Sequence, residues 1–202
     1  MDHVRKHFKK VDPILHAAIA GKEWYTLTRT HDHFMGLCRI IIGQQVSTKA
    51  AQSIFNKFCE LFPKKKPTAK AVLSLTDAQI RSAGLSTSKT NAVRDLALRV
   101  ENKSLPLKKI PQMSNEEISI ELVKVRGIGS WSAEMFLMFY LGREDVFSSG
   151  DLGLRTAIMK LYKKRSLPSP EAASKIAQIW SPYRSYACRI LWDTLNNPSA
   201  KK

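Results

Sequence analysis

One stretch of the sequence, Val125-Arg-Gly-Ile-Gly-Ser130, has residue types and a spacing suited to holding a phosphate group. Its two glycines flank the apolar Ile128, so the chain can turn sharply and another backbone can approach with no Cβ in the way. Ser114 and Glu117 form a capping box that begins a helix before the turn, and Ser130 can cap another helix after it. Backbone amides at such a turn and helix start bind phosphate oxygens. Because flanking helices and a basic chain accompany the glycines, the stretch favours a DNA-gripping hairpin over an ordinary turn.

A second candidate for chemistry is the carboxylate of Asp151, in the segment Gly150-Asp-Leu-Gly153. The residue stands where the next helix is predicted to begin, and the commonest reason for an aspartate there is to cap the helix. A functional carboxylate needs the same geometry, because capping holds it rigidly at the mouth of the helix. Gly150 and Gly153 would leave room for a bulky ligand beside it. The residues alone leave the structural and the functional interpretation about equally open.

Large side chains on two further helices are candidates for contacting a ligand. Trp192 lies off the apolar stripe that begins at Ala187, so it either packs against a second lobe or contacts a ligand, and we favour the ligand. The helix after the hairpin is apolar nearly all round, with Trp131, Met135 and Met138 on one side. Such a helix is buried in a core or lines an enclosed pocket. For Met135 and Met138 the residues favour the core.

The elements that must position these groups are helices. Apolar residues recur with helical spacing along most of the chain, and no stretch has a convincing strand alternation. The predicted fold class is therefore all-α. Ser169-Pro-Glu171 has an N-cap, a proline and an acid in the order that opens a helix. The basic run Pro63-Lys-Lys-Lys-Pro67 is the clearest boundary and predicts a loop between helices.

The composition of the chain favours some classes of function and excludes others. The 202 residues include 33 Lys and Arg against 17 Asp and Glu, a formal charge of +16. This excess indicates a polyanionic partner, although an anionic membrane surface would also attract it. Cys38, Cys59 and Cys188 are too few and too far apart for a zinc site or a cysteine-ligated cluster, so we expect reduced thiols in a cytosolic or nuclear protein. No apolar stretch is long enough for a membrane span and the amino end has no signal-peptide core, so we expect neither secretion nor membrane insertion.

Taken together, these motifs resemble a known family. The stretch Val125–Ala133, followed about twenty residues later by Gly150-Asp151, is similar to the helix–hairpin–helix DNA glycosylases with a Gly/Pro-rich loop and an essential aspartate, the HhH-GPD superfamily. Two further stretches, Ile42-Gly-Gln-Gln-Val-Ser47 and Trp180-Ser-Pro-Tyr-Arg-Ser-Tyr-Ala187, resemble its alkylation-repair branch, the compact AlkA-type DNA-3-methyladenine glycosylase II. The resemblance covers the chain from about residue 12 to residue 192.

The resemblance implies a two-lobed, all-helical fold with the active cleft between the lobes. One lobe, about residues 38–142, would contain the hairpin. The other, about residues 1–37 plus 143–202, would be assembled from both ends of the chain, so that residues 1–202 form a single catalytic unit. The amino-terminal β-sheet lobe of longer bacterial relatives has no counterpart here, and a monomer is expected.

The chemistry of the family implies that a target nucleotide is flipped out of the duplex, because its glycosidic bond cannot be reached in the stack. Asp151 matches the catalytic aspartate, whose carboxylate stabilises the oxocarbenium-like sugar and positions or deprotonates the attacking water. Trp192, Trp131 and Met135 match the base pocket. A cationic alkylated base over the indole of Trp192 gains a cation–π energy of roughly 0.5–2 kcal/mol. Trp131 stands where bifunctional relatives carry a Schiff-base lysine, so no lyase step is expected.

The expected DNA contacts follow from the same resemblance. Gly127 and Gly129 match the phosphate-gripping turn, and Gln45 matches the wedge that fills the gap left by the flipped nucleotide. The other residues expected to contact DNA are Gln44, Ser47, Lys89, Arg126 and Ser130. The resemblance also implies that the backbone carbonyls of Val123, Val125 and Ile128 can hold a Na⁺ or K⁺ ion that bridges to phosphate. No cofactor is otherwise required, and an iron–sulfur cluster is not expected because no cysteine cluster follows the helix of Asp151.

Three positions depart from the family pattern. Arg126 replaces the usual proline of the hairpin, Gln45 is polar where some relatives insert an apolar wedge, and Met135 stands where some carry a pocket tyrosine. The resemblance implies a monofunctional glycosylase of base excision repair that hydrolyses the N-glycosidic bond of 3-methyladenine-type and 7-methylguanine-type bases in duplex DNA. It would act in a bacterial nucleoid or a eukaryotic nucleus. The alternative is a non-catalytic protein that uses the same hairpin to grip or scan DNA, which would not need the carboxylate of Asp151.

Overall fold

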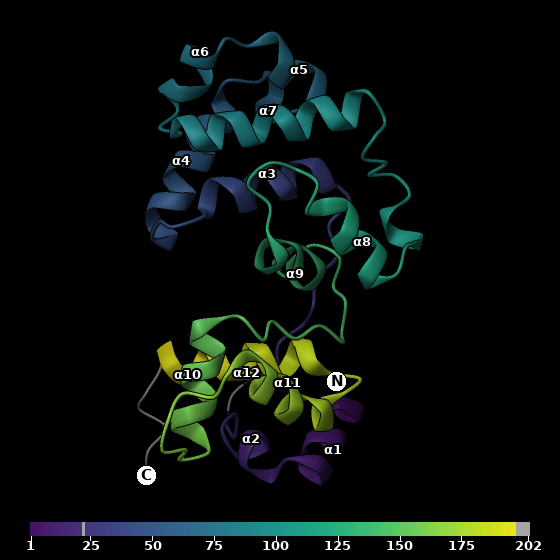
Figure 1. Cartoon of the computed structure of the whole chain (residues 1–202), viewed down its shortest axis with the longest axis vertical. Helices are drawn as coiled ribbons and strands as arrows, with labels where there is room; N and C mark the ends of the chain where they lie inside the picture. Colours follow the sequence, from purple (N-terminus) through teal and green to yellow (C-terminus); the bar gives the residue numbers. More distant parts are fainter. Residues whose placement is uncertain (22, 197–202) are drawn as a thin grey trace. The chain divides into compact units, whose positions relative to one another are not determined.

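The computed structural model describes residues 1–21 and 23–196, and Figure 1 shows that this part of the chain is built from helices and connecting loops. No residue in these two ranges is in a β-strand, which confirms the predicted all-α class. Within the same ranges, no helix combines the length and the apolar character needed to cross a membrane.

The chain divides into two compact units. Unit 1 consists of residues 1–28 and 142–202, and unit 2 consists of residues 29–141. The second boundary lies within one residue of the predicted position, but the first lies at 28/29 rather than 37/38. The predicted boundary would cut helix α3 (His33–Gly43), whose buried face continues across it through Phe34, Leu37 and Ile41. A helix with one continuous apolar face packs as a whole, so all of α3 belongs to unit 2.

Unit 2 is a cluster of helices around the central α3, which packs against α4, α7 and α9. Its α-helices after α3 are α4 (Thr48–Glu60), α5 (Ala69–Ser74), α6 (Asp77–Ser82), α7 (Thr87–Glu101), α8 (Asn115–Leu122) and α9 (Ser130–Phe139), with short 3₁₀ turns η1 (Pro63–Lys65) and η2 (Ile110–Gln112). The basic run at 63–67 forms the predicted loop, between α4 and α5. It lies inside unit 2 and is therefore not a boundary between units.

Unit 1 joins the amino-terminal segment to the carboxyl-terminal third of the chain. Its elements are α1 (Asp2–Val11), α2 (Pro13–Ala17), α10 (Leu152–Leu161), α11 (Pro170–Ala177), the 3₁₀ turn η3 (Gln178–Trp180) and α12 (Arg184–Asn196). The buried carboxylate of Asp12 links three of these parts. It accepts hydrogen bonds from the Leu15 amide at 2.9 Å, from the Trp180 indole at 2.7 Å and from the Tyr162 hydroxyl. Burial and the contact with Asp12 raise the pKa of Tyr162, so this hydroxyl stays a donor.

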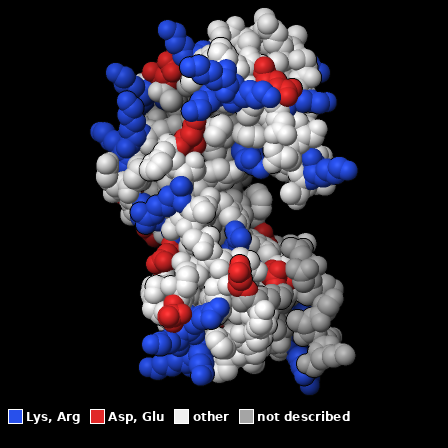
Figure 2. All heavy atoms as spheres, turned by 180° about the vertical axis from the view of Figure 1, so that it is seen from behind, with Lys and Arg blue, Asp and Glu red and all other residues white. Residues whose placement is uncertain are grey.

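Positive charge is spread over both units. The sequence of unit 1 contains 16 Lys and Arg against 8 Asp and Glu, and that of unit 2 contains 17 against 9. Figure 2 shows basic side chains gathered in several groups on the face seen there, with acidic side chains scattered among them. The excess of cations is thus a property of each unit and not of the hairpin alone.

Candidate functional site

The carboxylate of Asp151 caps helix α10 and is held by a tryptophan from helix α12. Its Oδ1 atom accepts a hydrogen bond from the backbone amide of Leu154 at 2.7 Å, which is an N-cap contact. The same oxygen accepts a hydrogen bond from the indole Nε1 of Trp192 at 3.2 Å. These two hydrogen bonds fix the orientation of the carboxylate, and Asp151 as a whole is half-buried. The structural interpretation left open by the sequence is confirmed, and the geometry that a functional carboxylate needs is present with it.

The two glycines beside Asp151 differ in their surroundings. A Cβ built on Gly153 would lie 3.0 Å from Oδ1 of Asp151, which is closer than most side chains tolerate, and 3.5 Å from the Trp192 ring, which is an ordinary van der Waals contact. A Cβ on Gly150 would meet no atom within 4 Å. Gly153 therefore makes room for the contact between Asp151 and Trp192, whereas Gly150 faces open space.

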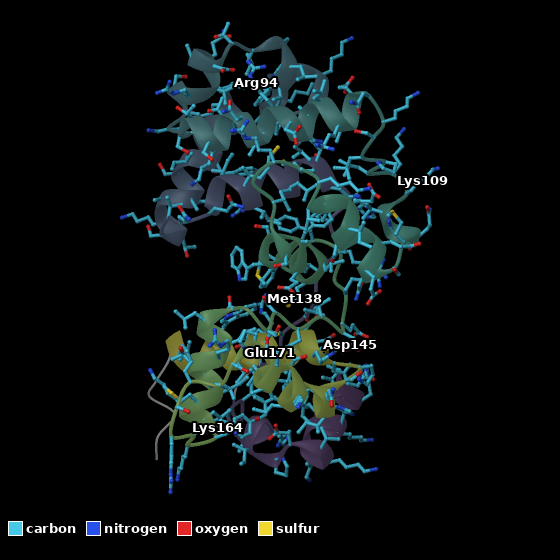
Figure 3. All side chains as sticks on the ribbon, in the orientation of Figure 1. Arg94, Lys109, Met138, Asp145, Lys164 and Glu171 are labelled. Carbon is cyan, nitrogen blue, oxygen red and sulfur yellow. The ribbon has the colours of Figure 1, made fainter. Side chains whose placement is uncertain are left out.

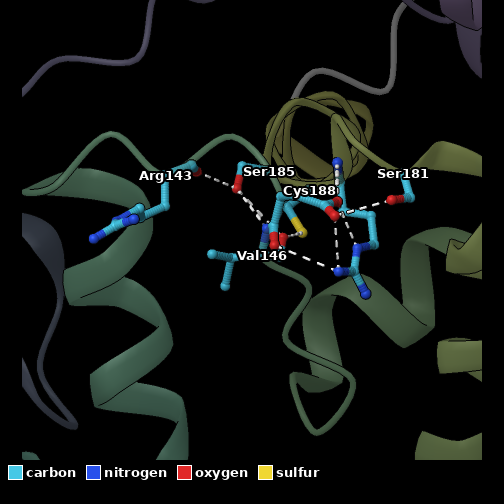
Figure 4. A network of polar contacts seen from close by, with 7 residues as sticks. Arg143, Val146, Ser181, Ser185 and Cys188 are labelled. Atoms are coloured by element: carbon cyan, nitrogen blue, oxygen red, sulfur yellow. Dashed lines mark hydrogen bonds and ion pairs between the residues drawn. The ribbon is translucent and has the colours of Figure 1, made fainter. Parts of the chain in front are cut away.

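The loop that leads to Asp151 is anchored to the start of α12, as the close-up in Figure 4 shows. Asp145 receives two hydrogen bonds from the guanidinium of Arg184, at 2.6 Å from Nε and 2.9 Å from Nη2, and another from the Ser181 hydroxyl at 2.9 Å. Burial acts to raise the pKa of Asp145, but the hydrogen bonds from Arg184 and Ser181 outweigh it and lower the pKa. The carboxylate is therefore ionised at neutral pH and pairs with Arg184.

A second residue of the same helix, the buried Ser185, completes this anchor. Its hydroxyl donates to the carbonyl of Arg143 at 2.6 Å and accepts from the amide of Val146 at 3.0 Å. The Ser185 amide donates to the carbonyl of Glu144 at 2.9 Å. The stretch Trp180–Ala187, which drew attention only through its resemblance to a family, thus has a physical role: it fixes residues 143–146, five or more residues before Asp151.

The hairpin forms between α8 and α9, as predicted. The capping box is present, with the Glu117 amide 3.1 Å from the Ser114 hydroxyl and the Ser114 amide 2.7 Å from the Glu117 carboxylate. Gly127 has φ +78°, a left-handed conformation that favours glycine. The prediction that Ser130 caps the second helix is wrong, because Gly129 is the N-cap, with no side-chain cap, and Ser130 is the first helical residue.

The hairpin turn is anchored by its own apolar side chains and by the residue that follows α3. The side chains of Val125 and Ile128 are buried, so they anchor the turn, and the glycines between and after them, Gly127 and Gly129, are exposed. The side-chain amide of Gln44 donates to the carbonyl of Gly127 at 2.8 Å and to the hydroxyl of Ser132 at 3.0 Å. Gln44 was predicted to contact DNA, and the structure shows its amide engaged in holding the hairpin.

Lys89 and Ser47, two more expected DNA contacts, also have partners inside unit 2. The Lys89 ammonium donates to the carbonyl of Ile42, near the end of α3, at 2.8 Å, and desolvation lowers the pKa of this ammonium. Ser47 caps α4 by accepting from the amide of Ala50 at 3.3 Å. Gln45, the expected wedge, is exposed and has φ +54°, an uncommon conformation for a residue other than glycine.

The two expected pocket residues of unit 2 lie one turn apart on α9. Trp131 has 43% of its surface exposed in the first turn, and Met135, four residues on, is 6% exposed. Residues with this spacing lie on the same face of a helix. Met138, labelled in Figure 3, is buried and belongs to the core, as the sequence favoured. The roles of Trp131 and Met135 toward a base stay predictions.

Two groups of residues are relevant to metal binding, the cysteines and the backbone carbonyls of the hairpin. Cys38, Cys59 and Cys188 are buried, and no group of three His, Cys, Asp or Glu side chains that could hold a metal is found in residues 1–21 and 23–196. At the hairpin, the Val125 carbonyl accepts the Ile128 amide at 3.0 Å. A carbonyl oxygen has a second lone pair, and the binding of a monovalent cation by the carbonyls of Val123, Val125 and Ile128 stays a prediction.

Two curated relatives are similar to most of this chain. The alkylbase DNA glycosidase-like protein mag2 of Schizosaccharomyces pombe is 30% identical over 192 residues, which covers 93% of this chain and 90% of that protein. DNA-3-methyladenine glycosylase 1 of the same yeast is 31% identical over 160 residues, covering 78% of this chain and 70% of the relative.

A solved structure and a family model lead to the same assignment. The S. pombe 3-methyladenine DNA glycosylase Mag1, solved in complex with abasic DNA, superimposes with a TM-score of 0.87 at 25% identity and covers 99% of both chains. The model of the HhH-GPD superfamily base excision DNA repair proteins matches residues 38–182, more than half of the sequence. The matched range contains both the hairpin and Asp151, and the chain belongs to the HhH-GPD superfamily of base excision DNA repair proteins.

Proposed function

We propose that this chain is a monofunctional DNA glycosylase that hydrolyses the N-glycosidic bond of alkylated purines, of the 3-methyladenine and 7-methylguanine type, in duplex DNA. The observation that carries the proposal is the carboxylate of the half-buried Asp151, whose orientation is fixed by the Leu154 amide and the Trp192 indole. Capping of α10 accounts for the contact with Leu154 but does not require the second contact, from Trp192, or the glycine at 153 beside it, and these two features favour a catalytic carboxylate over a protein that only binds DNA.

The proposed chemistry uses the negative charge of Asp151. As the bond between base and sugar breaks, positive charge develops on the sugar, and a preorganised carboxylate stabilises it electrostatically. The same group can orient or deprotonate the water that adds to the sugar carbon. An alkylated purine is already cationic and departs as a neutral base, so the reaction needs no general acid.

The residue at position 131 supports a glycosylase without lyase activity. Position 131 carries tryptophan, which has no amine to attack the sugar.

The exposed indole of Trp131 is suited to stacking, and Trp192 presents a second indole beside the carboxylate. A cationic base is attracted to indole faces more than a neutral base is, which would favour alkylated substrates.

The hairpin of unit 2 is proposed to hold a DNA phosphate. Gly127 and Gly129 are exposed, and their backbone can approach a phosphate with no Cβ in between. Backbone carbonyls are suitable ligands for Na⁺ or K⁺, and those of Val123, Val125 and Ile128 would hold the ion whose charge attracts the phosphate. The protein is proposed to act as a monomer and to need no other cofactor.

The test is base release from methylated duplex DNA by the wild-type protein and by Asp151→Asn, which keeps a side chain able to cap α10. We expect the variant to lose activity by about 10²–10⁴-fold while it still binds DNA. Strand breaks should appear only after alkali. Breaks without alkali would contradict the monofunctional assignment. DNA binding without base release by either protein would favour the non-catalytic alternative.

A further inference from the structure

We propose that Asp95 is a positioning residue that fixes the DNA-binding hairpin from the neighbouring helix α7. The proposal rests on the DNA-binding role proposed for the hairpin and assigns a function to a residue outside every motif considered above. Asp95 precedes the hairpin turn by about thirty residues, so the contact is made by the fold.

The contact is a hydrogen bond to the backbone of the turn. The Oδ2 atom of Asp95 accepts from the amide of Arg126 at 2.8 Å. The same oxygen accepts from Nε of Arg99, one turn further along α7, at 2.8 Å. The Asp95 side chain is 24% exposed, so both contacts are partly shielded from water. Arg99 thus orients the carboxylate, and the carboxylate orients the residue just before Gly127.

Two further residues on the same face of α7 make contacts with the same region. Lys89, Ala92 and Asp95 follow one another at intervals of three, which places them along one side of the helix. Lys89 holds the carbonyl of Ile42, two residues before Gln44. A Cβ on Gly127 would lie 3.1 Å from that of Ala92, so the turn packs closely on α7. One helix face therefore supports the end of α3 and the hairpin together.

The negative charge of Asp95 by itself would oppose DNA binding. Burial acts to raise the pKa of Asp95, but the Arg126 amide and Arg99 outweigh it and lower the pKa, so the group is anionic at neutral pH. An anion beside a phosphate-binding turn weakens DNA binding by Coulomb repulsion. A carboxylate at this place is therefore unfavourable unless its hydrogen bond to the turn contributes more than its charge costs.

The identity of residue 126 fits the same interpretation. A proline has no backbone N–H and could not donate to Asp95. Arg126 supplies the donor, so this anchor requires a residue other than proline here. The variant Arg126→Pro removes the donor, whereas Arg126→Ala keeps it and removes only the side chain.

The experiment compares Asp95→Ala with Asp77→Ala as a matched control. Asp77, in the first turn of α6, pairs with Arg94, the residue of α7 beside Asp95. Both variants remove one negative charge from an Asp–Arg pair. The affinity for a duplex with a stable abasic-site analogue should fall about tenfold for Asp95→Ala and stay unchanged or rise slightly for Asp77→Ala. Electrostatics alone gives the opposite sign for Asp95, so unchanged or tighter binding by Asp95→Ala would overturn the proposal.

Three further readouts separate positioning from a general loss of stability. The single-turnover rate of base release at saturating enzyme should change by less than twofold, since the proposed role of the hairpin is to hold a phosphate and the proposed chemistry is that of Asp151. Hydrogen exchange of the Arg126 amide should accelerate in Asp95→Ala and not in Asp77→Ala. In an Arg126→Pro background, Asp95→Ala should cost no further affinity, and additive losses would contradict the proposed contact.

Two further outcomes also have a defined meaning for the role proposed for Asp95. If Asp95→Ala does not fold, Asp95→Asn takes its place, with weaker binding expected and unchanged binding overturning the proposal. If the wild-type protein releases no base from any methylated duplex, the proposed activity fails, while the DNA affinities still test the role of Asp95.

Discussion

The indole N–H of Trp192 and the backbone amide of Leu154 donate to the same oxygen of Asp151, at 3.2 and 2.7 Å. One contact comes from the helix that Asp151 caps and the other from α12, which packs against it. The orientation of the carboxylate therefore depends on how two helices pack as well as on local capping. The tryptophan that the resemblance assigns to stacking on the base has a second function here, as a hydrogen-bond donor.

This double role predicts the effect of Trp192→Phe. The phenyl ring keeps an aromatic face but cannot donate to Asp151. A hydrogen bond to a charged group contributes about 1.5 kcal/mol or more, so the rate of base release at saturating enzyme should fall about tenfold. Trp192→Leu, which also removes the aromatic face, should lose more and should weaken binding of the damaged duplex. Equal rates for Trp192→Phe and the wild type would show that the indole N–H is unimportant.

Gly153→Ala should separate activity from stability. An alanine in the first turn of α10 favours the helix by up to about 1 kcal/mol relative to glycine. Its Cβ, however, would press on the carboxylate of Asp151, at 3.0 Å from Oδ1, while it meets the Trp192 ring at an ordinary contact distance. We expect unchanged or higher thermal stability with a clear loss of base release. Gly150→Ala is the matched control, because a Cβ there meets nothing within 4 Å and should leave the rate nearly unchanged. A fully active Gly153→Ala protein would contradict this account.

The features that the sequence predicted well are those set by nearby residues. The helical class, the capping box at Ser114 and the N-cap at Asp151 depend on residues within one turn of each other, and all three are present. The cap of α9 was misplaced by one residue because both Gly129 and Ser130 suit an N-cap. Extended backbone at Gly129 (φ −98°, ψ −179°) decides between them.

The features that the sequence did not reveal are contacts between distant segments. Lys89 was expected to contact DNA because of the family resemblance, and the structure shows its ammonium donating to the carbonyl of Ile42. Gln44 likewise binds the hairpin, 83 residues away in the sequence. Asp95 has an ordinary place on an amphipathic helix, and its partner Arg126 becomes its neighbour only when the helices pack. No local pattern encodes such partners.

The two hairpin glycines should respond differently to alanine. Gly127 has φ +78° and lies against Ala92, so Gly127→Ala should destabilise the fold by about 1–2 kcal/mol and weaken DNA binding as well. Gly129 has an extended backbone, and a Cβ added there would meet no atom within 4 Å, so Gly129→Ala should keep its thermal midpoint. If a phosphate approaches this turn, Gly129→Ala should still lose DNA affinity. Thermal melts beside DNA titrations distinguish the two cases, and wild-type affinity in both variants would argue against a phosphate at the hairpin.

Asp145 should make the stability of the protein depend on pH in a defined window. Its folded-state pKa is lowered, so its contribution is complete above the unfolded-state value of about 3.9 and is lost as the pH falls through the folded-state value. Asp145→Asn cannot ionise and should be less stable than the wild type by about 1–2 kcal/mol at pH 7. The difference should begin to shrink below about pH 4, where the unfolded wild-type chain takes up a proton, and should vanish once the pH has fallen through the lower folded-state pKa and the folded carboxyl is protonated too. Denaturant titrations of both proteins at several pH values between 7 and 3 measure this difference. Since Asp145 and Arg184 anchor the loop before Asp151, the variant should also release bases more slowly at pH 7. A stability difference that stays constant down to pH 3 would mean that the charge of Asp145 does not hold this loop.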